Sequence, residues 1–193
     1  MFDSGATRVL GVDPGLSRCG YGVVEQVDGH PRAVAAGVLT TPVGTPVPAR
    51  LRELAEELEL VMAEHQPNVV AVERVLFQAN ARTAMAVGQA SGMALLVAAR
   101  RGLPVVEYSP NEVKHAVAGY GGADKAQVQA MVQAVLRLSE RPDPPDVADA
   151  LALALCHLNA APLQAQVAAA TADRGRVPGL DHAIAAALAK EAG

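Results

Sequence analysis

The chain has 193 residues, of which 51% are hydrophobic and only 3% aromatic, and its formal net charge is -4. This length suits one well-buried domain, and a core of Ala, Val and Leu favours helices packed closely on a sheet. Two cysteines exclude a disulfide framework or a thiolate zinc site, and no uninterrupted apolar stretch is long enough to span a membrane. Because the N-terminal residues also lack the pattern of a signal peptide, we expect a cytoplasmic α/β protein with no membrane contact.

The acidic balance does not by itself exclude nucleic acid as a partner. Affinity for phosphate depends on where the cations lie on the surface rather than on their total number. The charge does not suggest DNA either, so evidence for a substrate has to come from a site.

The first forty residues predict three strands. In the predicted strand over 8–13, the residues from Val9 to Val12 are all apolar before Asp13, as expected of a central strand that is covered on both faces. Residues 20–25 and 33–39 have the pattern of an antiparallel pair, and Asp28-Gly29 is a turn signal between them.

Helices and strands alternate after the third strand. The predicted elements are a helix over 49–65, a strand over 69–73, a helix over 80–101, a strand over 104–108, and helices over 111–117, 124–138 and 144–159. Together they predict a five-stranded mixed sheet flanked by helices on both faces. We expect 1–162 to form this domain and 163–193, which are rich in Ala and Gln, to form a partly disordered tail.

Four acidic residues stand at the ends of apolar elements. Asp13 ends the first strand, Glu73 ends the fourth, and Asp146 and Asp149 lie on one face of the last helix near its start. If the first and fourth strands are parallel neighbours, their terminal acids meet at one edge of the sheet. Carboxylates gathered there would repel one another, but with divalent metal they suit the attack of water on a phosphodiester. The pattern therefore predicts a metal-dependent nuclease.

Each acid also has a simpler interpretation. Asp13 could simply be the first residue of an Asp-Pro-Gly turn. Glu73 could form an ion pair at the sheet edge with the arginine that follows it. Asp146 could complement a helix dipole, whereas Asp149, beside apolar residues, is harder to explain in this way. A metal site accounts for all four together.

Further motifs carry a resemblance to a known family. They are Asp13-Pro14-Gly15, Gly20-Tyr21-Gly22, Ala71-Val72-Glu73-Arg74-Val75, Gly88-Gln89-Ala90-Ser91-Gly92, Tyr108-Ser109-Pro110, Val113-Lys114, Gly119 to Lys125, and Asp146-Val147-Ala148-Asp149-Ala150-Leu151-Ala152. In order and spacing, over roughly residues 8–160, they resemble RuvC, a family of Holliday junction endonucleases.

The resemblance implies a ribonuclease H-like fold and a function in recombination and repair. It implies a homodimer that nicks two opposed strands of a four-way junction and leaves 5′-phosphate ends that a ligase can seal. The expected cofactor is Mg²⁺ or Mn²⁺, two ions per subunit, and the branch-migration proteins RuvA and RuvB are the expected partners besides DNA. The ligands and catalytic residues that the resemblance implies are Asp13, Glu73, Asp146 and Asp149.

Four further residues are candidates for DNA contact. Lys114 and Lys125 match family lysines near the scissile phosphate, although either could be an ordinary surface lysine. Lys125 also follows a Gly-rich turn at a helix start, where free backbone N–H groups favour an anion. We also expect Arg74 to contact DNA. The family often has Phe where this chain has Leu76, so Phe77 is our candidate to stack on an unpaired base, with an ordinary core Phe as the alternative.

Small residues recur on the predicted helix over 80–101, at Ala84, Gly88 and Gly92. An interior Gly costs about 1 kcal/mol relative to Ala, so close approach of another element is the expected compensation. That element is either the helix's own sheet or a second subunit, and the resemblance places the dimer interface here.

Two other classes of function are alternatives to the nuclease. A sugar kinase or chaperone-type ATPase also begins with a strand that ends in Asp, but it needs a duplicated domain and a second phosphate loop. A catalytically silent junction-binding module would gain phosphate affinity by losing the acids, so the full set argues against it. The histidines His65, His115 and His157 are expected on helix surfaces or in the core, not as ligands.

Overall fold

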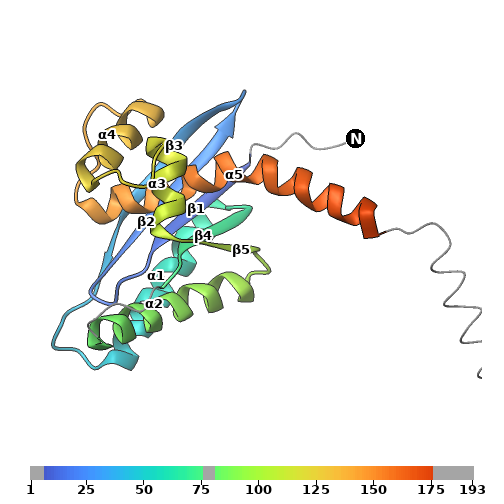
Figure 1. Ribbon diagram of the computed structural model, residues 1–193. Coiled ribbons are helices and arrows are strands. Elements are labelled where there is room, and N and C mark those ends of the chain that lie inside the picture. The colour runs from blue at the N-terminus through green and yellow to red at the C-terminus, as the bar shows by residue number, and fades with distance from the viewer. Residues whose placement is uncertain (1–6, 76–80, 176–193) are drawn as a thin grey trace, which may run out of the picture. The chain divides into compact units, whose positions relative to one another are not determined.

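The structure is a computed structural model that describes residues 7–75 and 81–175, without the side chains of residues 81–82 and 162–175. The elements are β1 (Arg8–Asp13), β2 (Arg18–Val27), β3 (His30–Thr40), α1 (Val47–His65), β4 (Val69–Glu73), α2 (Ala81–Arg100), β5 (Val105–Tyr108), α3 (Pro110–Ala118), α4 (Lys125–Leu136) and α5 (Pro145–Gly175) (Figure 1). The chain divides into two units between Asn159 and Ala160, and the five-stranded sheet lies in the first.

The sheet has the strand order β3-β2-β1-β4-β5. β1 is antiparallel to β2 and parallel to β4, and β4 is parallel to β5, so the predicted mixed sheet is confirmed. The turn between β2 and β3 has left-handed backbone at both Asp28 (φ 50°) and Gly29 (φ 80°). Two such residues match the twist of a two-residue hairpin, which explains why the Asp-Gly signal marks this turn.

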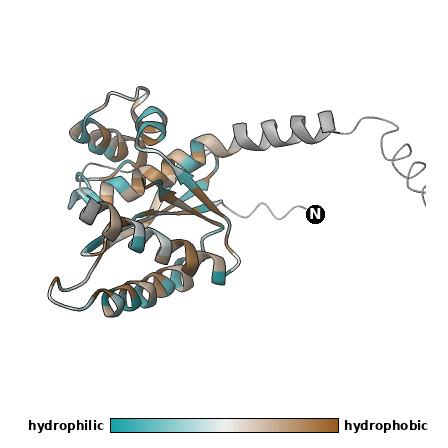
Figure 2. Ribbon diagram, turned by 60° about the horizontal axis from the view of Figure 1, so that its bottom comes forward, coloured by the Kyte–Doolittle hydropathy of each residue, from teal (hydrophilic) through white to brown (hydrophobic). Residues whose placement is uncertain are grey.

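Helices cover both faces of the sheet. α1 and α2 pack against each other and bury Leu54, Leu58 and Val97 in one core with residues of β1 and β4. The part of α5 before Ala160 lies on the opposite face, and α3 and α4 pack together on that same side (Figure 1). Coloured by hydropathy, the strands between these layers are mostly hydrophobic, whereas hydrophilic residues gather on the outward faces of the helices (Figure 2).

Three glycines let α5 approach the sheet closely. A Cβ at Gly11 would lie 2.0 Å from the carbonyl oxygen of Ala150, and one at Gly22 would lie 2.9 Å from the Leu151 backbone nitrogen. A Cβ at Gly20 would lie 2.2 Å from the carbonyl oxygen of Asp146. A side chain at any of the three would force the helix away, so these glycines set the height of the start of α5 above β1 and β2.

Three elements are clearly longer than predicted. β2 and β3 both begin earlier and end later than expected, because they pair along their whole length as one hairpin. α5 does not end near Asn159 but continues past Pro162 to Gly175, since the Ala- and Gln-rich sequence there has high helix propensity. The disorder predicted for the tail falls on residues 176–193, which lie outside the described residues. Among the described helices, none is long and apolar enough to cross a bilayer.

Candidate active site

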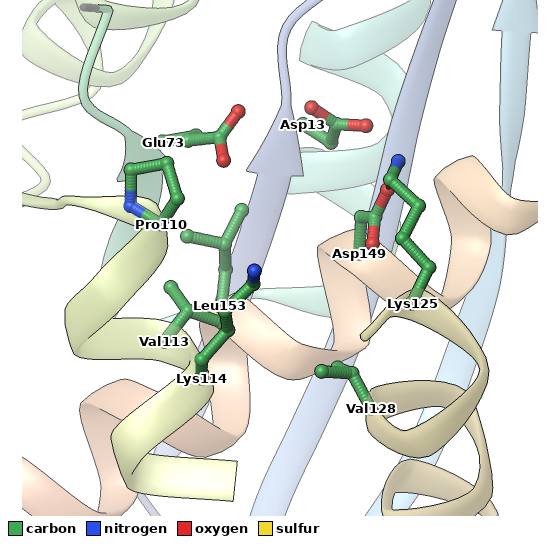
Figure 3. Close-up of a pocket in the computed structure, with 9 residues that line it drawn as sticks. All are labelled: Asp13, Glu73, Pro110, Val113, Lys114, Lys125, Val128, Asp149 and Leu153. Carbon is green, nitrogen blue, oxygen red and sulfur yellow. Dashed lines mark hydrogen bonds and ion pairs between the residues drawn. The ribbon is translucent and has the colours of Figure 1, made fainter. Parts of the chain in front are cut away.

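The parallel pairing of β1 and β4 brings two of the predicted acids together. Val12 is in register with Val72, so the next residue of each strand, Asp13 and Glu73, stands at the same edge of the sheet. Figure 3 shows both carboxylates directed into the same space from the ends of their strands. The strand-end prediction is therefore confirmed for this pair in position.

A cavity of about 280 Å³ opens beside these two acids. Asp149 reaches it from α5, so three of the four predicted acids line one space (Figure 3). The other lining residues are Pro110, Val113, Lys114, Lys125, Val128 and Leu153. The cavity is thus polar on the side of the strand ends and apolar where α3, α4 and α5 meet.

Both of the predicted ligands on α5, Asp146 and Asp149, are paired with a cation. The Nζ of Lys125 lies 3.1 Å from Oδ2 of Asp149. Arg18 donates to Oδ2 of Asp146 from both Nε (3.1 Å) and Nη2 (2.7 Å). Asp146, unlike the other three acids, does not line the cavity. In the part of the chain that the structure describes, no three Asp, Glu, His or Cys side chains are arranged as a ready-made metal site.

The ionised acids destabilise one another. Burial, followed by the negative charges of Glu73, Asp149 and Asp146, raises the pKa of Asp13 to about 7, against a smaller opposing effect of Lys125. Burial and the charge of Asp149 also raise the pKa of Glu73. The hydrogen bond and charge of Asp149 raise the pKa of Lys125. The site holds more negative charge than its own cations neutralise.

These residues fit a divalent cation. Carboxylate oxygens are the ligands that Mg²⁺ and Mn²⁺ prefer, and a cation in the cavity would relieve the repulsion that makes an ionised Asp13 unfavourable. Asp13, Glu73 and Asp149 are placed to hold it, and Asp146 could join them on leaving Arg18. Two histidines lie where the sequence predicted, His115 on a helix surface and His157 in the core. The Nδ1 of His157 is 2.9 Å from the Tyr108 hydroxyl.

The candidate DNA contacts separate into three groups. Lys114 and Lys125 both line the cavity, and Lys114 has no ion pair within the described residues. Arg74 instead lies beside β5 and α3, where Nη2 donates to the carbonyl oxygen of Glu107 (3.1 Å) and Nη1 lies 3.9 Å from Glu112. Leu76 and Phe77 lie outside the described residues.

The start of α4 differs from the prediction in one respect. Its N-terminal backbone does not offer free N–H groups throughout, because the Asp124 side chain accepts a hydrogen bond from the Gln127 N–H (2.8 Å) in a capping box. A carboxylate at this position competes with an anion for the helix end. Lys125 therefore contributes to the site through its side chain.

The sequence interpretation missed a polar network under the loop that follows Asp13. The buried Arg50, only 6% exposed, donates from Nε to Oγ1 of Thr41 (2.9 Å) and from Nη2 to Oγ of Ser17 (2.6 Å). Thr41 in turn donates to the carbonyl oxygen of Leu16 (2.6 Å). A signal was present, because Arg50 precedes Leu54 and Leu58 at four-residue spacing on the apolar face of α1.

A five-stranded mixed sheet with acids at the ends of its first and fourth strands, and a helix that carries two more, defines a ribonuclease H-like nuclease. The family model for "Crossover junction endodeoxyribonuclease RuvC" matches residues 9–157. The chain therefore belongs to the RuvC family of crossover junction endodeoxyribonucleases.

Relatives of that name cover most of the chain. The one from Salinispora arenicola is 55% identical over 170 residues, which are 88% of this chain and 97% of the relative. The one from Chloroflexus aggregans is 52% identical over 155 residues, 80% of this chain and 94% of the relative. The ribonuclease H-like domain is thus matched almost from end to end.

Solved structures agree with this assignment. Thermus thermophilus RuvC in complex with a Holliday junction substrate superposes with a TM-score of 0.78 at 36% identity, over 82% of this chain and 96% of that one. The yeast mitochondrial Holliday junction resolvase, at 15% identity and a TM-score of 0.58 over 79% of each chain, is similar in fold.

Proposed function

We propose that this protein resolves four-way DNA junctions in recombination and repair by metal-dependent nicks on two opposed strands, leaving 5′-phosphate ends that a ligase can seal. The observation that carries the proposal is the cavity in which Asp13, Glu73 and Asp149 converge beside Lys114 and Lys125. A Thermus thermophilus relative of the same family was solved with a Holliday junction, which supports the choice of substrate.

The residues of the cavity have distinct functions in this proposal. Asp13, Glu73, Asp149 and Asp146 hold the metal, which when bound activates water and stabilises charge on the phosphate. Lys114, which has no ion pair among the described residues, is available to bind the scissile phosphate. Lys125 binds it as well when Asp149 turns to the metal. The apolar wall of Val113 and Leu153 limits the access of bulk water and strengthens these interactions.

The metal is Mg²⁺ or Mn²⁺, with two ions per subunit. A ligand set made only of carboxylate oxygens suits these hard cations and excludes the sites that zinc forms with Cys or His. Asp13, Glu73, Asp146 and Asp149 would together hold these ions, which would supply the positive charge that favours displacement at phosphorus.

A homodimer would supply two such sites for the two equivalent strands of a junction. The exposed face of α2 supports an interface there, because a Cβ added at Gly88 or Gly92 would meet no atom of another described element within 4 Å. Packing on the chain's own sheet therefore does not explain these two glycines. Met85 (67% exposed) and Leu96 (59%) flank them with apolar surface. Gly88→Leu should yield a monomer by sedimentation, with the melting temperature nearly unchanged.

Other contacts in the proposal rest on the family resemblance. Phe77 stacks on a base at the opened crossover, Arg74 contacts the backbone nearby, and RuvA and RuvB deliver the junction. Phe77→Ala should stay folded, cut intact junctions poorly and recover on a junction whose centre is already unpaired. Normal cutting of intact junctions, or a large drop in melting temperature, would remove Phe77 from this function.

The decisive experiment uses a labelled synthetic four-way junction beside a linear duplex of the same sequence. We expect paired nicks in the junction with Mg²⁺ or Mn²⁺, no cutting in EDTA and little cutting of the duplex. Asp13→Asn should bind the junction and not cut it. Binding without cutting by the parent protein would instead favour the silent module, and ATP hydrolysis would favour the ATPase class.

A further inference from the structure

Asp146 is the one predicted metal ligand that stands apart from the cavity, and its partner is a residue with no assigned function. We propose that Arg18 is a positioning residue that holds Asp146 outside the metal site until a cation binds, and that Arg18 then binds a DNA phosphate instead. This inference rests on the proposed function, because it requires the cavity to take a divalent cation.

The contact between Arg18 and Asp146 is specific in geometry. Two donors of the guanidinium, Nε at 3.1 Å and Nη2 at 2.7 Å, reach the same carboxylate oxygen. The guanidinium holds the carboxylate at this oxygen, and its positive charge opposes the approach of a metal cation. The lining of the cavity includes Asp13, Glu73 and Asp149 but not Asp146, which is consistent with a carboxylate held elsewhere by Arg18.

The backbone that carries Arg18 is held firmly. A Cβ at Gly15 would lie 2.1 Å from the Arg18 carbonyl oxygen, so the turn after Asp13 is too tight for any other residue without rearrangement. The Thr41 N–H donates to the Ser17 carbonyl oxygen (3.2 Å), and Arg50 donates to the Ser17 hydroxyl (2.6 Å). The position of the Arg18 backbone is therefore independent of what its side chain binds.

The side-chain contact, in contrast, is easy to exchange. The Arg18 side chain is 50% exposed, and an exposed ion pair contributes little to stability. A divalent cation, which carries twice the charge and is held by three other carboxylates, competes well for Asp146. The guanidinium that is released carries several donors in a plane, which matches the oxygens of a phosphate.

Lys125 does not share this behaviour. It is paired with Asp149, yet both residues already line the cavity, so their contact does not remove a ligand from the site. Among the described residues, the contact with Arg18 is the only one that holds a predicted metal ligand outside the cavity. Metal binding and DNA binding should consequently favour each other, to the same extent in either direction.

The first test measures Mn²⁺ affinity calorimetrically in the full chain without DNA. Arg18→Gln should bind Mn²⁺ about 3–10-fold more tightly than the parent, because Asp146 is freed and one positive charge is removed. The matched control is Arg32→Gln, since Arg32 also donates to a carboxylate from two nitrogens, on the neighbouring strand. The control should bind Mn²⁺ as the parent does. Unchanged or weaker binding by Arg18→Gln overturns the proposal.

The second test measures the salt dependence of junction binding with Ca²⁺ as the metal and in EDTA. With Ca²⁺, Arg18→Gln should lower the slope of log K against log salt by about one, the value for one lost phosphate contact, while Arg18→Lys should retain it. In EDTA, Arg18→Gln and the parent should have the same slope, because Arg18 of the parent is then paired with Asp146 and does not contact a phosphate. A slope lowered equally in both conditions shows a permanent phosphate contact and overturns the exchange.

Failure of this inference is distinguishable from failure of the proposed function. If the parent binds Mn²⁺ no better than Asp13→Asn does, the cavity is not a metal site and both are overturned. If the parent binds Mn²⁺ and cuts junctions while Arg18→Gln matches it in both tests, only the inference is overturned. Melting temperatures of all variants confirm that each comparison is between folded proteins.

Discussion

Two buried acids at opposite ends of one sheet, Glu25 and Asp13, have opposite electrostatic surroundings. At one end, Glu25 on β2 is 3% exposed and pairs in register with Arg8, whose Nη2 donates to it at 2.7 Å, while Nε of Arg32 donates at 3.1 Å. The hydrogen bonds of these two arginines lower the pKa of Glu25. At the other end of β1, Asp13 lies among acids, and its pKa is raised to about 7 by burial and by their charges.

The difference separates a structural acid from a candidate metal ligand. Glu25 has its compensating charges within the chain, so its ionised form stabilises the fold. Asp13 lacks enough of them, so its ionised form is unfavourable until something outside the chain supplies positive charge. Burial alone does not mark an active site, whereas burial with uncompensated like charge does.

The largest expected effect compares a glutamate at each end. Glu73→Gln should lower junction cleavage by roughly 10³-fold or more, because metal stabilisation of the transition state contributes several kcal/mol and each ~1.4 kcal/mol is a factor of ten. Glu25→Gln should leave cleavage within a few-fold of the parent. Cleavage rates at saturating Mg²⁺ check this, and equal loss in both variants would indicate a shared folding defect.

The next effect is a gain in stability from losing a catalytic acid. Asp13 has a folded pKa of about 7 against an ordinary 3.8, so its contribution to stability is lost as pH rises through this window. In EDTA at pH 8, Asp13→Asn should therefore be more stable than the parent, by up to about 4 kcal/mol. At pH 4 the two should be nearly equal. Urea unfolding at both pH values measures this, and a less stable Asp13→Asn at pH 8 would contradict it.

Glu25→Gln should instead lower the stability of the fold, and by a smaller amount. The folded pKa of Glu25 lies below its ordinary 4.5, so its stabilisation is present above that pH and is lost as pH falls through the folded value. At pH 7 the substitution should cost about 1–2 kcal/mol, because it removes the charged hydrogen-bond partner of the half-buried Arg8 and the exposed Arg32. The cost should decrease at pH 3, and a cost that does not change with pH would indicate lost packing.

The smallest effect concerns a cation at the catalytic end. Lys114→Ala should lower the slope of log K against log salt for junction binding by about one and reduce the cleavage rate, with no change in stability. Arg32→Ala at the opposite end should change neither the slope nor the rate. A Lys114 variant identical to the parent in both would make this lysine an ordinary surface residue.

Much of the fold follows from local pattern. The apolar runs that end in Asp13 and Glu73, the Asp28-Gly29 turn and the spacing of apolar residues in α1 each reflect the period of a single element. These signals are short-range, so they predict the existence and order of elements well. They do not predict how far α5 continues. Pro162 suggests that the helix ends there, whereas the helix propensity of the Ala- and Gln-rich residues that follow carries it to Gly175.

By itself the sequence predicted which residues are candidates to carry the chemistry, since a metal site accounts together for acids that close two apolar strands and open an apolar helix. Only the tertiary structure decided how these acids are paired. That Asp146 binds Arg18, 128 positions away, and that Gly20 leaves room for the backbone of Asp146, depends on the docking of α5 on β2. Such contacts join residues distant in the chain, and no periodicity or local motif encodes them, because they arise only when two complete elements pack together.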